Sequence, residues 1–155
     1  MSERLKLGLM VNNLGPNQLA YSACRNFNTL QDTNVDGVLF FVEKQRRCMP
    51  TNFAVMQLFE AYEFTGSLIA TDINTAGKLI RFPSTDKKFF YVWDLEWIRM
   101  GNQKSYEQLR SIYGNPELKL LARSALHAKA ISDVWDKPCE VVEDCNVKEL
   151  IRICI

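Results

Sequence analysis

The sequence contains very little histidine. His127 is the only one in 155 residues, and the five cysteines include no pair spaced as CxxC. Structural zinc sites take cysteine and histidine ligands at short fixed spacings, so we expect no metal site, and no motif indicates an organic cofactor. The number of cysteines is odd and no secretory signal pattern precedes them, which predicts reduced thiols in a cytoplasmic protein.

Long hydrophobic runs are also missing. The first residues, MSERLKLGLMVNN, are charged and then apolar for too few positions to form a signal-peptide core or a membrane span. We therefore expect no membrane attachment.

Neither sign of charge dominates. Lysine and arginine number 19 and aspartate and glutamate 18, a net charge of +1, so there is no overall electrostatic case for nucleic acid or an anionic membrane. The basic cluster at 44–47 is either a solvated loop or a local anion contact. No spacing typical of nucleic-acid-binding motifs occurs, and a nucleic-acid partner is unsupported.

Short apolar runs alternate with segments of helical periodicity along the whole chain. The predicted strands are 5–11, 38–42, 67–70, 88–93, 118–122 and 139–142. The predicted helices are 18–30, 53–64, 75–82, 103–113, 125–135 and 147–153. In 53–64 we expect Phe53, Met56, Phe59 and Ala61 to face inward.

This alternation, with 47% hydrophobic residues, predicts an α/β fold. We expect residues 1–155 to form a single Rossmann-like three-layer domain with a mostly parallel sheet of about six strands. Ligands of such folds bind beyond the carboxyl ends of the strands, near the point where the strand order reverses. That rule selects the candidate site residues.

The loop after the first predicted strand carries Asn12, Asn13, Gly15 and Asn17. Free N–H groups at the start of the next helix could hold an anionic or hydroxyl-rich ligand. A purely structural interpretation is also open, in which Gly15-Pro16 forms a turn and Asn17 is a helix N-cap.

The run FFYVWDLEWIR ends a predicted strand in two carboxylates flanked by indoles. Asp94 and Glu96 are candidate catalytic residues, because carboxylates can hold sugar hydroxyls or act as a general base, and Trp93 and Trp97 could pack on sugar rings. The alternative is that Trp97 covers the core and Asp94 caps a turn.

Arg123, Ser124 and His127 follow the fifth predicted strand. The Arg123 guanidinium is the better anion ligand, since it can bind phosphate in a bidentate manner. An imidazole in the first turn of a helix could also donate to an anion, although a lone histidine is more often structural.

Nearly the whole chain resembles a known family in the order of its elements, and the resemblance is specific in three places: the loop after the first predicted strand, the WDLEW run and the last third. LKLLARSALHAKAISDVWDKPCEVVEDCNVKELIRI is similar to the end of the amino-terminal, acceptor-side half of GT-B glycosyltransferases, with its "xxHAxxI" and "vVxDxxNVxxL" patterns. WDLEW resembles the family's "vHDLEW", with Trp93 where a histidine is expected. By this resemblance Asp144 corresponds to the position just before the interdomain linker.

The resemblance implies a glycosyltransferase-like protein that supplies only the acceptor-side half. A second chain or a second copy would hold the nucleotide-sugar donor, and the isolated chain would be inactive. It extends to short chains of this kind in tailed phages, which would act in the host cytoplasm. A catalytically inactive module that binds a protein or nucleotide is the alternative, and a structural assembly role is a third.

We also expect a homo-oligomer or a protein partner. The sequence stops after a segment that resembles an interdomain connection, so Ile153 and Ile155 could form an exposed apolar rim. Alternatively, these residues fold back onto the domain's own sheet.

Overall fold

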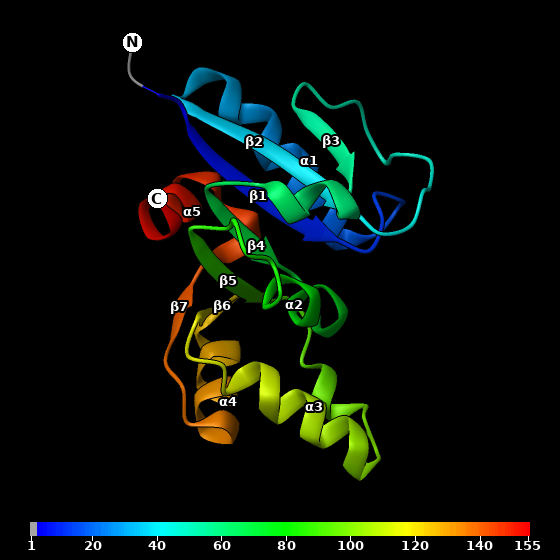
Figure 1. Ribbon diagram of the computed structural model, residues 1–155, viewed down its shortest axis with the longest axis vertical. Coiled ribbons are helices and arrows are strands. Elements are labelled where there is room, and N and C mark those ends of the chain that lie inside the picture. Colours follow the sequence, from blue (N-terminus) through cyan, green and yellow to red (C-terminus); the bar gives the residue numbers. More distant parts are fainter. Residues whose placement is uncertain (1–2) are drawn as a thin grey trace.

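The computed structural model describes residues 3–155 as an α/β domain built on one parallel sheet. Its seven strands lie in the order β3-β2-β1-β4-β5-β6-β7, which Figure 1 shows from β3 at the upper right to β7 at the left. The strands are β1 (Leu5–Val11), β2 (Val35–Phe41), β3 (Ala54–Gln57), β4 (Ser67–Ala70), β5 (Lys87–Val92), β6 (Leu118–Ala122) and β7 (Cys139–Val141).

Helices cover both faces of the sheet, so the expected three-layer architecture is confirmed. The α-helices are α1 (Gln18–Phe27), α2 (Ile73–Leu79), α3 (Gln103–Tyr113), α4 (Ala125–Trp135) and α5 (Val147–Cys154). Short 3₁₀ helices occur at η1 (Asn28–Asp32), η2 (Leu58–Glu63), η3 (Glu96–Ile98) and η4 (Glu143–Cys145).

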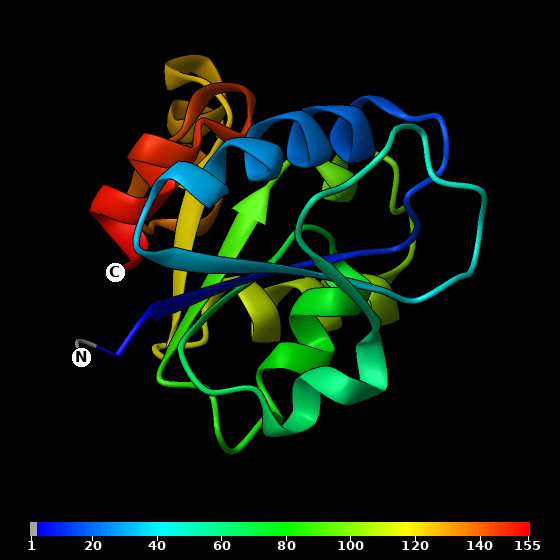
Figure 2. The same ribbon diagram turned by 90° about the horizontal axis from the view of Figure 1, so that it is seen from above.

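Alternate residues of each strand enter two separate cores. Leu7 and Leu9 of β1 pack with α1 and α5, whereas Met10 packs with the side chains of η2, α2, α3 and α4. Viewed from above, α1 and α5 lie on one side of the sheet and α2 lies on the other (Figure 2). The inner strands β1, β4, β5 and β6 are mostly buried on both faces, which explains why they are apolar runs rather than alternating ones.

The predicted helix 53–64 is wrong. Its first part is the edge strand β3, where Val55 pairs with Leu39 of β2, and its second part is η2. Met56 and Phe59, expected inside, are exposed, whereas Ala61 is buried. The periodicity of a short apolar run does not distinguish a strand from a helix. Here 54–57 forms a strand because it pairs with the free edge of β2. This strand is also the reason that the sheet has seven strands rather than six.

The C-terminal helix folds back onto the sheet. Val147, Leu150 and Cys154 of α5 are buried against the core beneath β1, and Ile153 and Ile155 are half-buried rather than fully exposed. Lys87 Nζ donates to the carbonyl of Ile155 at 3.1 Å. Of the two alternatives for these residues, the structure has the one in which they pack on the domain's own sheet.

In residues 3–155 no helix is both long enough and apolar enough to cross a membrane.

Candidate functional site

A polar crevice lies at the point where the strand order reverses. The chain runs outward from β1 to β2 and β3, and then returns to place β4 on the other side of β1. Parallel sheets splay their loops apart at such a point and leave room for a ligand. Here a crevice of about 410 Å³ opens between the β1–α1 loop and the segments that follow β4 and β5. Its polar lining is Asn12, Asn13, Asn17, Gln18, Thr71, Asp72, Asp94, Glu96 and Arg99.

Amides from the β1–α1 loop form one wall. Asn13 Oδ1 accepts hydrogen bonds from the Gly15 N–H and the Asn17 amide, both at 3.0 Å. Asn17 is also the N-cap of α1, and its Oδ1 accepts from the Ala20 N–H at 2.8 Å. The structural interpretation of Asn17 is therefore confirmed, while Asn12, Asn13 and Asn17 all still line the crevice.

Gly15 lies beside the crevice rather than on its wall. A Cβ at this position would meet Gln45 Oε1 at 2.3 Å, so the segment after β2 crosses close to the glycine. Because that atom is the end of a flexible side chain, the contact shows only that Gln45 reaches over Gly15.

Three carboxylates also line the crevice. Asp72 is the N-cap of α2, accepts from the Thr75 N–H at 2.7 Å and also accepts from the Asn12 amide. Asp94 forms an ion pair with Arg99. Glu96 Oε1 accepts from the Ile73 N–H at 3.0 Å.

The pKa of Glu96 is higher than that of a carboxylate on the surface. Half-burial raises its pKa to about 7, and the nearby negative charges of Asp72 and Asp94 add to that rise, whereas the Ile73 N–H and Arg99 oppose it. A carboxyl group with a pKa near neutrality can accept or donate a proton at working pH, which is the property of a general acid or base.

Arg123 and Trp93 form a second feature at this edge of the sheet. The guanidinium of Arg123 lies over the indole of Trp93, 4.2 Å from the ring centroid, and donates to the Trp93 carbonyl at 3.4 Å. Gln18 Oε1 accepts from the same guanidinium at 3.5 Å. One face of Trp93 is thus occupied, and Arg123 is held close to the crevice, although it is not among the lining residues.

Ser124 and His127 lie at the start of α4. Ser124 Oγ accepts from the His127 N–H at 3.1 Å, as an N-cap does. The His127 side chain is half-buried, and its Nδ1 has no hydrogen-bond partner within residues 3–155. Neither residue lines the crevice, so the structure separates them from Asp94 and Glu96.

Trp97 packs in an aromatic cluster. Its ring makes edge contacts with Tyr113 at 5.5 Å and Trp135 at 5.8 Å between centroids. It is partly buried and covers the core, as the alternative interpretation expected, and of the two indoles Trp93 lines the crevice.

Gln18, Thr71, Asp72 and Arg99 also line the crevice, although none of them is among the predicted site residues. A usable signal for Asp72 was present, because Asp-Ile-Asn-Thr after a buried strand is the spacing of a capping box. Arg99 comes soon after Asp94 and Glu96, and no sequence pattern indicates that it lines the crevice. Across the described part of the chain, no group of three His, Cys, Asp or Glu side chains could hold a metal ion.

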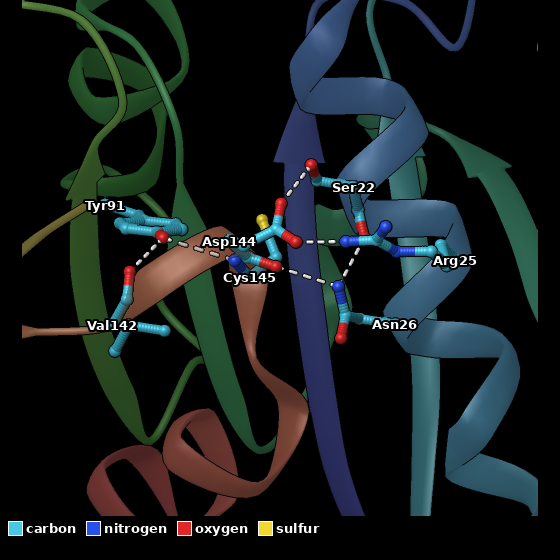
Figure 3. A network of polar contacts seen from close by, with 7 residues as sticks. All are labelled: Ser22, Arg25, Asn26, Tyr91, Val142, Asp144 and Cys145. Carbon is cyan, nitrogen blue, oxygen red and sulfur yellow. Dashed lines mark hydrogen bonds and ion pairs between the residues drawn. The ribbon is translucent and has the colours of Figure 1, made fainter. Parts of the chain in front are cut away.

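Asp144 lies in a separate network beyond the carboxyl end of β7. Its carboxylate accepts from Ser22 Oγ at 2.5 Å and pairs with Arg25, and its carbonyl accepts from the Asn26 amide at 2.8 Å (Figure 3). Tyr91 Oη donates to the Val142 carbonyl and accepts from the Cys145 N–H at 3.3 Å. These bonds fasten η4 to α1 and β5, so the network is a structural clamp.

Comparisons with protein-family models, with curated proteins and with solved structures find no match to this chain.

Proposed function

We propose that the switch-point crevice binds a hydroxyl-rich ligand, and that the protein is the acceptor-side half of a glycosyltransferase-like assembly. The observation that carries the proposal is that Glu96, Asp72 and Asp94 line the same crevice as the amides of the β1–α1 loop. Carboxylates accept hydrogen bonds from sugar hydroxyls, and asparagine amides both donate and accept. The crevice combines the two kinds of group.

Glu96 is the better candidate for a general base. Its raised pKa, about 7, lets it take a proton from an acceptor hydroxyl near neutral pH. Asp94 is half-exposed and neutralised by Arg99, which suits it to orienting a ligand rather than to proton transfer. Arg123 is the candidate for a contact with a phosphate carried by the donor, since a guanidinium stacked on an indole keeps N–H donors in its plane.

The donor would come from a second chain or a second copy. By the resemblance to GT-B enzymes, the nucleotide is held mainly by the other half, and the histidine expected before Asp94 is here Trp93. The isolated chain should then release no UDP or GDP from a panel of nucleotide sugars. Nucleotide release by the purified chain, lost in Asp94→Ala, would mean that it is a complete enzyme.

Ligand binding is tested separately from turnover. We expect calorimetry or NMR titration with a panel of sugars and glycosides to find a ligand whose affinity falls at least about tenfold in Asn12→Ala and in Glu96→Ala. Glu107→Gln is the matched control, because Glu107 is exposed on α3 and takes part in no contact of the crevice. A panel with no binder, or a binder unaffected by both crevice variants, would contradict the proposal.

A second candidate is a catalytically inactive binding module on the same fold. It is favoured by the fact that each crevice carboxylate already has a partner within the chain: Asp72 has Asn12, Asp94 has Arg99, and Glu96 has the Ile73 N–H. The two candidates differ in one measurement. A pull-down from the native host would identify a partner, and light scattering would show whether the two form a complex. Adding that partner should start sugar transfer if the protein is half of a glycosyltransferase, and should not if it is an inactive binding module.

A further inference from the structure

A second crevice, lined mostly by cations, lies where β5 and β6 begin. Its volume is about 650 Å³, which is within the range of ligand pockets in proteins. Because the strands are parallel, this basic crevice lies at the amino edge of the sheet, opposite the switch-point crevice at the carboxyl edge. Its charged lining is Arg81, Asp86, Lys87, Lys88, Glu117 and Lys119.

The charges of the basic crevice do not balance within the chain. Four cations and two carboxylates give its lining a net charge of +2. Lys88 and Glu117 form the one ion pair between these groups in residues 3–155. Arg81 and Lys119 are exposed, and neither side chain has a hydrogen-bond or ion-pair partner in the described part of the chain. Like charges that lie close together repel one another, so an anion bound among them is attracted.

Lys88 is the cation that is built into the wall. Its side chain is only 12% exposed, and its Nζ lies 3.6 Å from Glu117 Oε2 and donates to the Ile80 carbonyl at 3.1 Å. A largely buried ammonium group attracts an anion more strongly than an ammonium group in open water does, because water and salt screen it less.

The backbone before β5 is fixed by Gly66. The Gly66 carbonyl accepts from the Asp86 N–H at 3.0 Å and from the Lys87 N–H at 3.4 Å. Gly66 has a φ of 118°, and a Cβ there would lie 2.7 Å from the Lys6 carbonyl oxygen, so this position requires glycine. The two lysines that begin β5 therefore start from a backbone that is already in place before a ligand binds.

The cations of the basic crevice come from three segments. Lys87 and Lys88 are on β5, Arg81 follows α2, and Lys119 is on β6, where it pairs with Phe89 of β5. An anion whose charge is spread over several linked groups can contact cations on all three segments, whereas one carboxylate has only two oxygens to share among them.

We propose that the basic crevice binds an oligophosphate, an anion with two or more linked phosphate groups. Lysine ammonium groups and a guanidinium are the side chains that proteins commonly use to bind phosphate oxygens. Ile80, Phe82 and Pro83 give the crevice an apolar part, against which a group attached to the phosphates can pack. The site is separate from the switch-point crevice and does not rest on the function proposed above.

The test is a titration of the full chain with inorganic tripolyphosphate at constant ionic strength, followed by calorimetry and by NMR of the backbone amides. We expect saturable binding, with the largest chemical-shift changes at Asp86, Lys87 and Lys119. Added sodium chloride should weaken the binding, because salt screens the exposed cations. No saturable binding, or the largest changes at Asn12 and Glu96 of the other crevice, would overturn the proposal.

Matched variants identify the site. Arg81→Gln and Lys119→Gln should each weaken tripolyphosphate binding about tenfold, since each removes one charge-assisted contact with the anion. Lys148→Gln is the control, because it removes the same unit charge at an exposed position of α5 outside the basic crevice. Tryptophan fluorescence checks that all three variants are folded. An affinity that is unchanged in both crevice variants, or lowered equally in the control, would contradict the assignment.

Two further ligands identify the source of the phosphates. ATP that binds more tightly than tripolyphosphate, and is weakened by the same two variants, supports the site as one for nucleoside polyphosphates. ATP that binds equally or less tightly supports it as a site for the phosphate chain alone. A single-stranded oligonucleotide that binds more tightly than both, and is weakened by the same variants, would overturn the proposal in favour of a nucleic-acid surface.

Discussion

The guanidinium of Arg123 lies 4.2 Å from the centroid of the Trp93 indole. The two residues follow β5 and β6, which are neighbours in the sheet, so the contact joins two loops at the rim of the crevice. Trp93 stands where the resemblance to GT-B enzymes expects a histidine. The position here anchors a cation rather than supplying an imidazole.

The first prediction concerns this stack. Arg123→Gln should lower the free energy of unfolding by about 1 kcal/mol, because it removes a partly desolvated cation–π contact and a hydrogen bond to the Trp93 carbonyl. Urea unfolding followed by tryptophan fluorescence measures the change. Arg110→Gln, at an exposed position of α3, is the control and should be close to neutral. Equal losses in both variants would show that the stack contributes nothing specific.

The second prediction is a pH dependence at Glu96. Its folded pKa, about 7, lies above the ordinary value of 4.5, so the folded state favours the protonated form. Between about pH 4.5 and 7 the unfolded chain has lost this proton and the folded chain keeps it, and the contribution of Glu96 to stability therefore falls as the pH rises. Above about pH 7 the loss is complete.

Glu96→Gln removes this titration while keeping an acceptor for the Ile73 N–H. The stability of the variant relative to the native chain should increase by about 1–2 kcal/mol from pH 4.5 to 8, a figure reduced from the full linkage because the side chain is partly solvated. Urea unfolding across that range, with a carbon-13 NMR titration of the Glu96 carboxyl, measures it. A carboxyl that titrates near 4.5 would contradict the prediction.

The third prediction concerns the clamp around η4. Tyr91→Phe should cost about 1–3 kcal/mol of unfolding free energy, because it leaves the buried Val142 carbonyl and Cys145 N–H without their partner. Tyr62→Phe is a matched control, since Tyr62 is exposed. Chemical denaturation of the two variants tests it, and a Tyr91 variant as stable as the control would mean that the clamp is dispensable.

The fourth prediction concerns α5. Leu150→Ala should lower the free energy of unfolding by about 2–5 kcal/mol, because Leu150 is fully buried beneath the sheet. Ile153→Ala, at a half-buried position of the same helix, should cost clearly less. Thermal and urea unfolding compare them. Equal, small effects would indicate that α5 is not docked on the sheet in solution.

Much of the fold could be predicted from the sequence because local and tertiary preferences agree. The bounds of β1, β4 and β6, and of α3 and α4, match the predicted ranges. Each of these strands is an apolar run buried on both faces, and Asn102 and Ser124 cap the two helices at their predicted starts. The position of the crevice also followed from the alternation of strands and helices, through the rule for ligand sites in parallel sheets.

Only the tertiary structure decided the remainder, because it depends on contacts between distant residues. The segment 54–57 became a strand since β2 offered it an unpaired edge. Asp72 entered the crevice because the reversal of strand order set β4 beside β1, which brought its carboxylate to Asn12. The same packing placed Trp97 against the core and raised the pKa of Glu96. The pattern of one segment cannot predict such contacts. Each contact depends on two segments and on the sheet that aligns them.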